Sequence, residues 1–98
     1  MIFKFNPQAS NDLDEAFKWY ENQQSGLGAR FITEVESSIT RILYFPNIGR
    51  IIIKDIHRFL IPNFPYGIMY SINNEVIEIY AIAHLHRKPF YWKDRKAG

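Results

Sequence analysis

The chain has 98 residues, of which 47% are hydrophobic and 16% aromatic, and its formal net charge is +2. This length fits one domain over residues 1–98, and this composition excludes a disordered chain. The absence of cysteine excludes a disulfide framework, a thiolate metal site and a cysteine nucleophile.

The sequence also bears on location. No apolar run approaches the roughly 18 residues that a membrane span needs, and the first residues become polar too soon for a signal peptide. We therefore expect a cytoplasmic protein with no membrane partner.

The first half of the chain reads as a short strand over residues 1–6 followed by two helices. Asn6 and Pro7 form a helix start, because Asn caps a helix well and Pro suits its first position. Gly26 suits the end of this helix, since glycine adopts the left-handed conformation easily. A second apolar stripe begins at Leu27 and ends before Pro46. The short connection predicts an antiparallel helical hairpin.

The second half changes to an extended pattern. Residues 50–54, 56–62, 66–72 and 76–85 are rich in β-branched and aromatic residues, which predicts strands. Asn73 and Asn74 predict a tight turn. Residues 90–96 are expected to form a helical turn or a basic tail. The fold class is therefore α+β, with the hairpin on one face of a mostly antiparallel sheet of three to four strands.

Strict alternation along the last strand predicts which side chains face the helices. One set of alternating positions is entirely apolar and is expected in the core: Ile77, Ile79, Ala81, Ala83 and Leu85. The other set would lie on a partly open face: Glu78, Tyr80, Ile82, His84 and His86. Arg58, Leu60 and Met69 are expected on the same open face, which is the mixed composition of a binding site.

Charge is unevenly distributed along the chain. Residues 1–49 hold four Lys/Arg and six Asp/Glu, a net charge of −2, whereas residues 50–98 hold eight and four, a net charge of +4. A basic second half suggests a polyanion or an acidic protein as partner, and a solvated basic tail is the alternative.

Three kinds of site are compatible with these residues. Basic and aromatic residues near the C-terminus suit nucleic-acid binding, and His84 or His86 could transfer a proton in RNA cleavage. The two histidines have a chelating spacing, but further ligands are not evident, so neither a metal nor another cofactor is expected. Protein binding is the third interpretation, with Trp19 as an edge-packing or interface residue.

Three motifs resemble the RelE/ParE superfamily of bacterial toxins. Residues 16–36 read AFKWYE, GLGARF and VE, similar to the family's helical hairpin. Arg58 followed by FPYGIMY at 64–70 resembles a strand of its ParE-like members, and AHLHRKP at 83–89 with Trp92 resembles their ending. The motifs occur in the family's order and cover nearly the whole chain.

The resemblance implies a plasmid-stabilisation type toxin that a cognate antitoxin neutralises, as a homodimer or a toxin–antitoxin hetero-oligomer. ParE-like members inhibit DNA gyrase, and RelE-like members are ribosome-dependent mRNA endoribonucleases. Gly67 replaces an arginine of the nucleases, and Trp92 falls near their terminal tyrosine. Gyrase inhibition is therefore preferred, and an inactive relative that only binds a partner protein is a further alternative.

The resemblance and the charge pattern together select the site residues. Target binding is assigned to Arg58, Arg87, Lys88 and Trp92. If the chain is instead a metal-independent nuclease, the catalytic residues would be His86, His84, Arg58, Arg87 and Tyr91.

Overall fold

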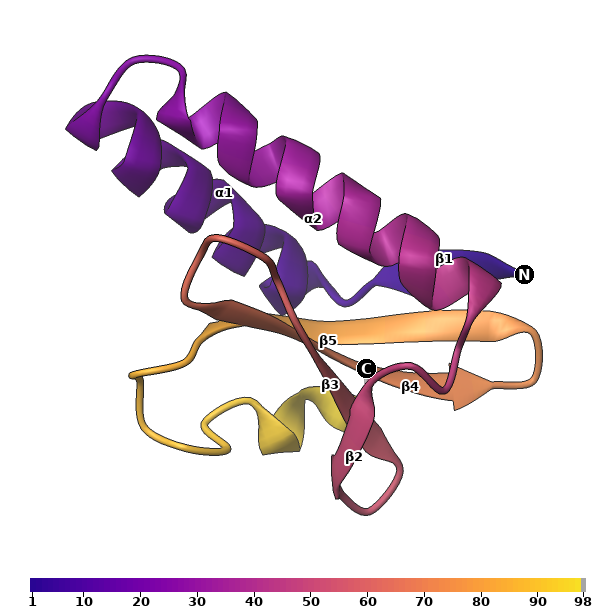
Figure 1. Ribbon diagram of the computed structural model, residues 1–98. Coiled ribbons are helices and arrows are strands. Elements are labelled where there is room, and N and C mark those ends of the chain that lie inside the picture. Colours follow the sequence, from indigo (N-terminus) through magenta and orange to yellow (C-terminus); the bar gives the residue numbers. More distant parts are fainter. Residues whose placement is uncertain (98) are drawn as a thin grey trace.

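The computed structural model describes residues 1–97, with side chains through Arg95. In chain order it contains β1 (Ile2–Phe5), α1 (Pro7–Gln23), α2 (Leu27–Tyr44), β2 (Arg50–Ile53), β3 (Ile56–Leu60), β4 (Tyr66–Asn73), β5 (Val76–His84) and a final 3-10 helix, η1 (Lys93–Ala97). The strands form one sheet in the order β1-β5-β4-β3-β2 (Figure 1).

The N-terminal strand, the helical hairpin and the run of strands confirm the predicted fold class. The sheet has five strands because β1 joins it, parallel to β5, while the other three pairings are antiparallel. Asn74 has a φ of 57° in the predicted turn between β4 and β5.

The start of α1 is as the sequence predicts, whereas its end is capped by Gln24 in an extended conformation and the left-handed Gly26 caps the start of α2 instead. The Asn6 side chain accepts a hydrogen bond of 2.7 Å from the Gln8 amide, which caps the start of the helix. Gly26 adopts a φ of 89° in the connection to α2. The Glu21 carboxylate then accepts hydrogen bonds of 2.9 Å from the amides of Gly26 and Gly28. One acidic side chain of α1 therefore satisfies free amides at the start of α2.

The main core lies between the helical hairpin and one face of the sheet. Buried side chains of α2, Phe31, Val35 and Ile42, pack with Ile68 and Ile77 of the sheet. Tyr20 and Phe31 add edge-to-face contacts with Phe64 and Tyr66 at centroid distances of 5.0 to 6.1 Å. Apolar burial on this face fixes the hairpin to the sheet.

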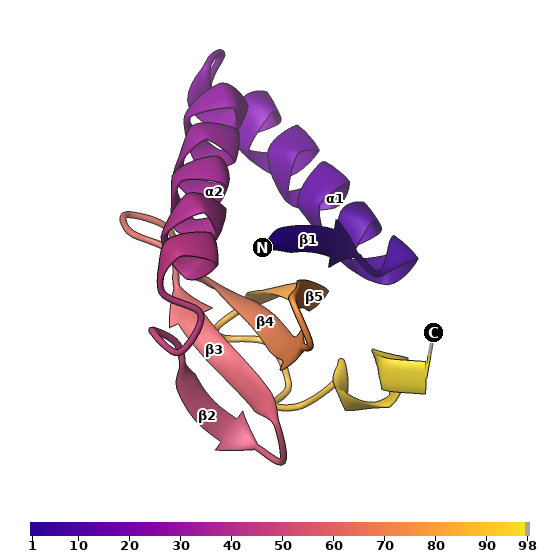
Figure 2. The ribbon, with the colours of Figure 1, turned by 90° about the vertical axis from the view of Figure 1, so that its right-hand side faces the viewer.

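The chain after β5 crosses to the opposite face of the sheet. We call residues 85–97 the C-terminal strap. Figure 2 shows the strap on the other side of β4 and β5 from the helices. The sheet is therefore covered on both faces near β5, and on the strap side this cover does not extend over the whole sheet. Within residues 1–97, no helix is long and apolar enough to cross a membrane.

Gly28 tests the close approach of the two helices. A Cβ atom at Gly28 would lie 2.7 Å from the Phe17 carbonyl oxygen, a distance that backbone cannot accept without moving. We expect Gly28→Ala to lower the free energy of unfolding by about 1–3 kcal/mol, measured by urea unfolding. The exposed Ser37→Ala on α2 is the control, and equal midpoints for the two variants would contradict this account.

Candidate functional site

A row of paired residues crosses the face of the sheet that lies opposite the helices. In register, Arg50 of β2 lies opposite Arg58 of β3, Arg58 opposite Met69 of β4, and Met69 opposite Ala81 of β5. Directly paired residues share a face of the sheet. Two arginines therefore lie over β2 and β3, and two apolar residues lie over β4 and β5.

The strap covers the apolar half of this face. Trp92 is 4% exposed and belongs to a small core with Met69, Ala81, Ala83 and Ile56. The strap closes the half of this face over β4 and β5 and also buries Ile56 at the start of β3. The predicted partly open face is therefore open only around exposed Arg50 and half-buried Arg58. Trp92 therefore stabilises the strap. It also contributes to the lining of the cleft described below, and its role in target binding stays a prediction.

An irregularity in β5 changes which of its side chains face the helices. The register shifts after Ile79, so that Tyr80 is an extra residue between the pairs Tyr70–Ile79 and Met69–Ala81. One inserted residue moves every later side chain to the other face. Ala81 and Ala83 therefore pack under the strap, and the prediction that they meet the helices was wrong.

The same shift relocates two residues that were expected on the open face. Ile82 is 1% exposed in the core beneath the helices. His84 lies opposite Tyr66, with the two rings in an edge-to-face contact at 5.0 Å. Tyr80 does lie on the strap side, but its hydroxyl is hydrogen-bonded to Ser71 and Glu78.

Asp12 of α1 ties the shifted part of β5 to the strap. Its carboxylate accepts a hydrogen bond of 3.1 Å from the Ile82 amide and forms an ion pair of 2.6 Å with Arg95. Arg95 also donates to the Tyr80 carbonyl at 3.2 Å, and the Arg95 carbonyl accepts from the Asn6 side chain at 3.0 Å. Because β1 pairs with β5 only as far as Ile79, the side chains of Asp12 and Arg95 provide hydrogen-bond partners for the β5 backbone beyond that residue.

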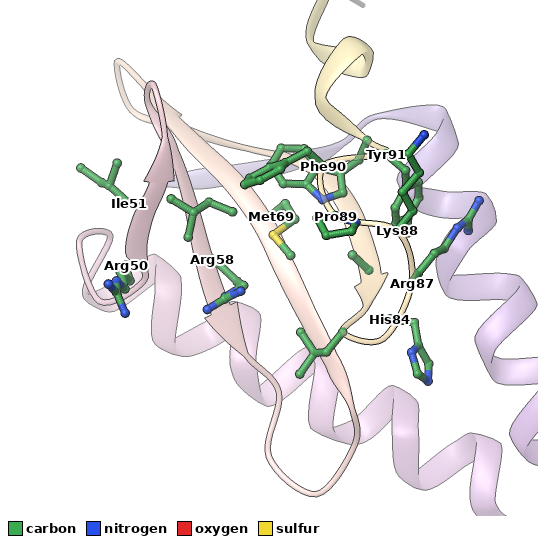
Figure 3. A pocket seen from close by; sticks show the side chains of 14 residues that line it. Arg50, Ile51, Arg58, Met69, His84, Arg87, Lys88, Pro89, Phe90 and Tyr91 are labelled. Atoms are coloured by element: carbon green, nitrogen blue, oxygen red, sulfur yellow. The ribbon is translucent and has the colours of Figure 1, made fainter.

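A cleft of about 420 Å³ lies between β2 and β3 on one side and the strap on the other. Four cationic side chains line it, namely Arg50, Arg58, Arg87 and Lys88. Figure 3 shows the two β-strand arginines on one side of Met69 and Pro89, with Arg87 and Lys88 on the other. Within the described residues none of the four forms an ion pair. The cleft is therefore a basic site with an apolar middle.

Half-buried His84 lines this cleft, and exposed His86 follows it in the chain. The His86 amide donates a hydrogen bond of 3.1 Å to His84 Nδ1, and the two ring centroids are 5.4 Å apart. His84 Nδ1 is thus an acceptor, which places the proton of the neutral ring on Nε2. The third histidine, His57, is buried, stacks on Tyr70 and donates from Nδ1 to the Gly49 carbonyl at 2.8 Å. Its role is structural.

Tyr91 is held inside the strap by two arginines. The Arg87 guanidinium lies 3.8 Å from the centre of its ring and that of Arg95 lies 5.3 Å away. Burial raises the pKa of Tyr91, the charge of Asp12 raises it further, and the two arginines partly offset this. Its hydroxyl therefore stays protonated near neutral pH and is suited to donate a hydrogen bond rather than to accept a proton.

The structure brings several of the predicted site residues together. Arg58, Arg87, Lys88, His84 and Tyr91 all line the cleft, and His86 follows on the exposed chain. The Lys96 side chain, which belongs to the predicted basic tail, lies outside the described residues. The roles of these cleft residues in binding or catalysis stay predictions.

Arg50 is the site residue that the sequence analysis missed. The turn pairs Ile53 with Ile56, and an unbroken hairpin would then place Arg50 opposite Phe59. A register shift between Ile51 and Ile53 moves Arg50 opposite Arg58 instead. The available signal in the sequence was that Arg50 and Lys54 lie close together in the basic half of the chain. The pairing of Arg50 with Arg58, however, depends on the register shift in β2.

Comparison with known proteins places this architecture in a family. A family model described as the ParE toxin of the type II toxin–antitoxin system parDE matches residues 3–89. The chain belongs to the ParE toxin family.

Solved structures agree with this assignment at the level of the fold. A chain from the chromosomal ParDE TA system of P. aeruginosa superposes on this ParE-family chain with a TM-score of 0.78 and 14% sequence identity. The similarity covers 88% of this chain and 97% of the other. No curated protein matches the sequence.

The ion pair between Asp12 and Arg95 gives a direct test of the strap. The two side chains are 9% and 14% exposed, and removing one partner leaves a charge that water solvates poorly. We expect Arg95→Ala to lower the free energy of unfolding by about 3 kcal/mol. Lys18→Ala breaks the exposed pair with Asp14 and should cost at most about 0.5 kcal/mol. Equal losses of unfolding free energy in the two variants, measured by urea unfolding, would contradict a stabilising role for the Asp12–Arg95 ion pair.

The raised pKa of Tyr66 predicts a loss of stability in alkaline solution. Burial and nearby acidic groups raise its pKa to about 12 from the ordinary value of 10.0. The folded state then holds this proton more tightly than the unfolded state, so its contribution is complete below about pH 10 and is lost as pH rises towards 12. We expect Tyr66→Phe to flatten the fall of unfolding free energy over that interval. Tyr44→Phe, at a 76% exposed residue, should leave it unchanged.

Proposed function

We propose that this chain is the toxin of a type II toxin–antitoxin module, that a cognate antitoxin neutralises it, and that it binds and inhibits a cellular protein such as DNA gyrase. The observation that carries the choice of binding over catalysis is the state of residues 91 and 92. Trp92 is buried and cannot transfer a proton, and burial raises the pKa of Tyr91 although Arg87 and Arg95 lie against its ring and partly offset this. In sequence position, these two residues correspond to the region where the related nucleases carry their terminal tyrosine.

Gly67 supports the same choice. A Cβ atom here would lie 3.2 Å from Cγ of Arg58 and 3.4 Å from Cδ2 of Leu85. The position where the related nucleases carry an arginine is thus filled by neighbouring side chains, and a longer residue would displace Arg58. The cations that remain can bind an acidic target surface, which needs charge and contact area but no proton transfer.

One feature favours a second candidate, the ribosome-dependent ribonuclease. His84 lines the cationic cleft, and the ring of His86 lies beside it. Histidine changes charge near neutral pH, so this pair could serve as general acid and base while Arg58 and Arg87 hold a phosphate.

A pair of assays separates these functions. In the first, purified toxin is added to cell-free translation with ready-made mRNA and the mRNA ends are mapped; in the second, gyrase supercoiling is measured. We expect intact mRNA and inhibited supercoiling. Replacing both histidines, His84→Ala with His86→Ala, should change inhibition only a few-fold.

The nuclease makes the opposite prediction. Cuts within codons that require the ribosome, and that fall by about 10² to 10⁴-fold in the double histidine variant, would overturn our proposal. Lys18→Ala, far from the cleft, serves as the control variant. Harmless expression of the free chain, with neither activity, would leave an inactive relative that only binds its partner.

A further inference from the structure

The strand β1 forms one free edge of the sheet. It is the first strand in the order β1-β5-β4-β3-β2 and pairs only with β5, in parallel. On that side the Ile2 amide donates to the Glu75 carbonyl at 3.2 Å, and the Asn6 amide donates to the Ile79 carbonyl at 2.9 Å. Because successive amides of a strand point to opposite edges, the amide and carbonyl of Phe3 point away from β5. Such an edge is a template for an added strand.

The apolar side chains of β1 extend the core to this free edge. Ile2 is 65% exposed and Phe3 is 43% exposed. The Phe3 ring contacts that of Phe5 at a centroid distance of 6.0 Å, and Phe5 packs against the core beneath the helices. Phe3 therefore continues that core outwards to solvent, and Lys4 is the one charged side chain that blunts the strand.

The end of α2 enlarges this apolar surface. Figures 1 and 2 both show the start of β1 beside the end of α2. Tyr44 and Phe45 are exposed there, and the loop that follows is held in place because the buried Tyr70 hydroxyl donates to the Pro46 carbonyl at 2.7 Å. The two segments present one preformed surface, the β1 patch: Ile2, Phe3, Tyr44 and Phe45. Monomeric proteins rarely leave such a patch uncovered.

The sequence of β1 matches a second copy of itself in one antiparallel register. When the two-fold axis passes beside Phe3, its outward amide and carbonyl pair with those of Phe3 in the other copy, and each Lys4 lies opposite the other copy's Ile2. Pairing Phe3 with Phe5 instead would place the two Lys4 side chains directly opposite, where like charges destabilise a sheet. Charge therefore selects the register centred on Phe3.

This register also brings opposite charges of the two copies together. Within its own chain Lys4 lies opposite Glu78 in the ladder, but it forms no ion pair within the described residues. The exposed Glu75 adjoins Ile2 through the backbone hydrogen bond described above. Lys4 of one copy, opposite Ile2 of the other, is thus within reach of that copy's Glu75. Two such pairs, related by symmetry, make the edge complementary to itself in charge.

We propose that two copies of this chain form a symmetric dimer through antiparallel β1–β1 pairing centred on Phe3. The two sheets join into one continuous sheet, and the β1 patch of each copy covers that of the other. A pair of short strands buries less than the roughly 1,600 Å² of a standard interface, so Tyr44 and Phe45 supply further contact and the dimer is of micromolar strength. The two basic clefts lie towards the far ends of the joined sheet and stay accessible. The dimer does not depend on the proposed target.

The oligomeric state and amide exchange of the purified full chain test this dimer. Sedimentation velocity from about 1 μM to about 1 mM should show a monomer giving way to a dimer. By NMR, the Phe3 amide should exchange more slowly as the dimer forms, whereas the Lys4 amide, which faces β5, should be unchanged. A chain that stays monomeric, or a dimer in which the Phe3 amide still exchanges fast, would overturn the proposal.

Two substitutions to lysine compare this edge with another exposed apolar position. Phe3→Lys places two cations opposite each other at the two-fold axis and should raise the dimer dissociation constant at least about 100-fold. Leu60→Lys, at an exposed residue that ends β3, is the matched control and should change it less than about three-fold. Thermal unfolding of each variant confirms that it is folded. Equal effects of the two variants would contradict a β1 interface.

A charge exchange keeps the test independent of the packing of Phe3. Lys4→Glu or Glu75→Lys alone should weaken association about five-fold, because each removes an attraction between the copies, and the double variant should restore it. Failure of the double variant to restore association would contradict the register. Protection of the Phe3 amide only in a co-purified antitoxin complex, with the free chain monomeric, would show that another protein occupies this edge and would overturn the proposal.

Discussion

The carboxylate of Asp12 is the contact on which the second face of this molecule depends. The strand β1 stops pairing with β5 at Ile79, just before β5 takes in an extra residue and its backbone needs other partners. Asp12 accepts from the Ile82 amide, and Arg95, held by the same carboxylate, donates to the Tyr80 carbonyl. One ion pair thus continues the edge of the sheet beyond β1 and fixes the strap to it. Both charges are largely shielded from water, which makes the pair sensitive to loss of either partner.

The position of the strap decides which chemistry is left on the surface. It covers Met69, Ala81 and Ala83 with Trp92 and reaches Ile56 at the start of β3, but it does not cover Arg50. Arg50 and Arg58 lie on one side of the cleft, and Arg87 and Lys88 lie on the other. Tyr91 and Trp92, the aromatic residues next to the basic tail, pack within the strap-side core. The cleft presents four cationic side chains together with Met69, Pro89 and the exposed ring of Phe90.

The motifs shared with the ParE family have structural explanations that differ along the chain. Glu21 and Gly28, in the hairpin motif, bring the end of α1 against the start of α2 through a cap and a close approach. Tyr70, in the strand motif, bonds with its hydroxyl to Gly49 and Pro46 and so holds the loop that leads into β2. These motifs make the scaffold. Gly67, also in the strand motif, lies beside Arg58, Met69 and Leu85, which line the cleft.

Local sequence signals were sufficient to predict the helices and strands, but they were insufficient to predict which face of the sheet each side chain occupies. The cap at Asn6, the left-handed Gly26, the stop at Pro46 and the turn at Asn74 each depend on one or two neighbouring residues, so the helices and strands could be predicted from the chain alone. The basic character of the second half was equally visible. The face of Ile82 and the burial of Trp92 could not be predicted, because a single extra residue at Tyr80 reverses the alternation. This shift is stabilised by the hydrogen bond from the Ile82 amide to Asp12, 70 residues earlier in the chain. The pairing of Arg50 with Arg58 likewise needs a bulge in β2. Sequence by itself determined the elements and the family, and tertiary structure decided which side chains form the cleft, since register and long-range hydrogen bonds act between segments that no local pattern connects.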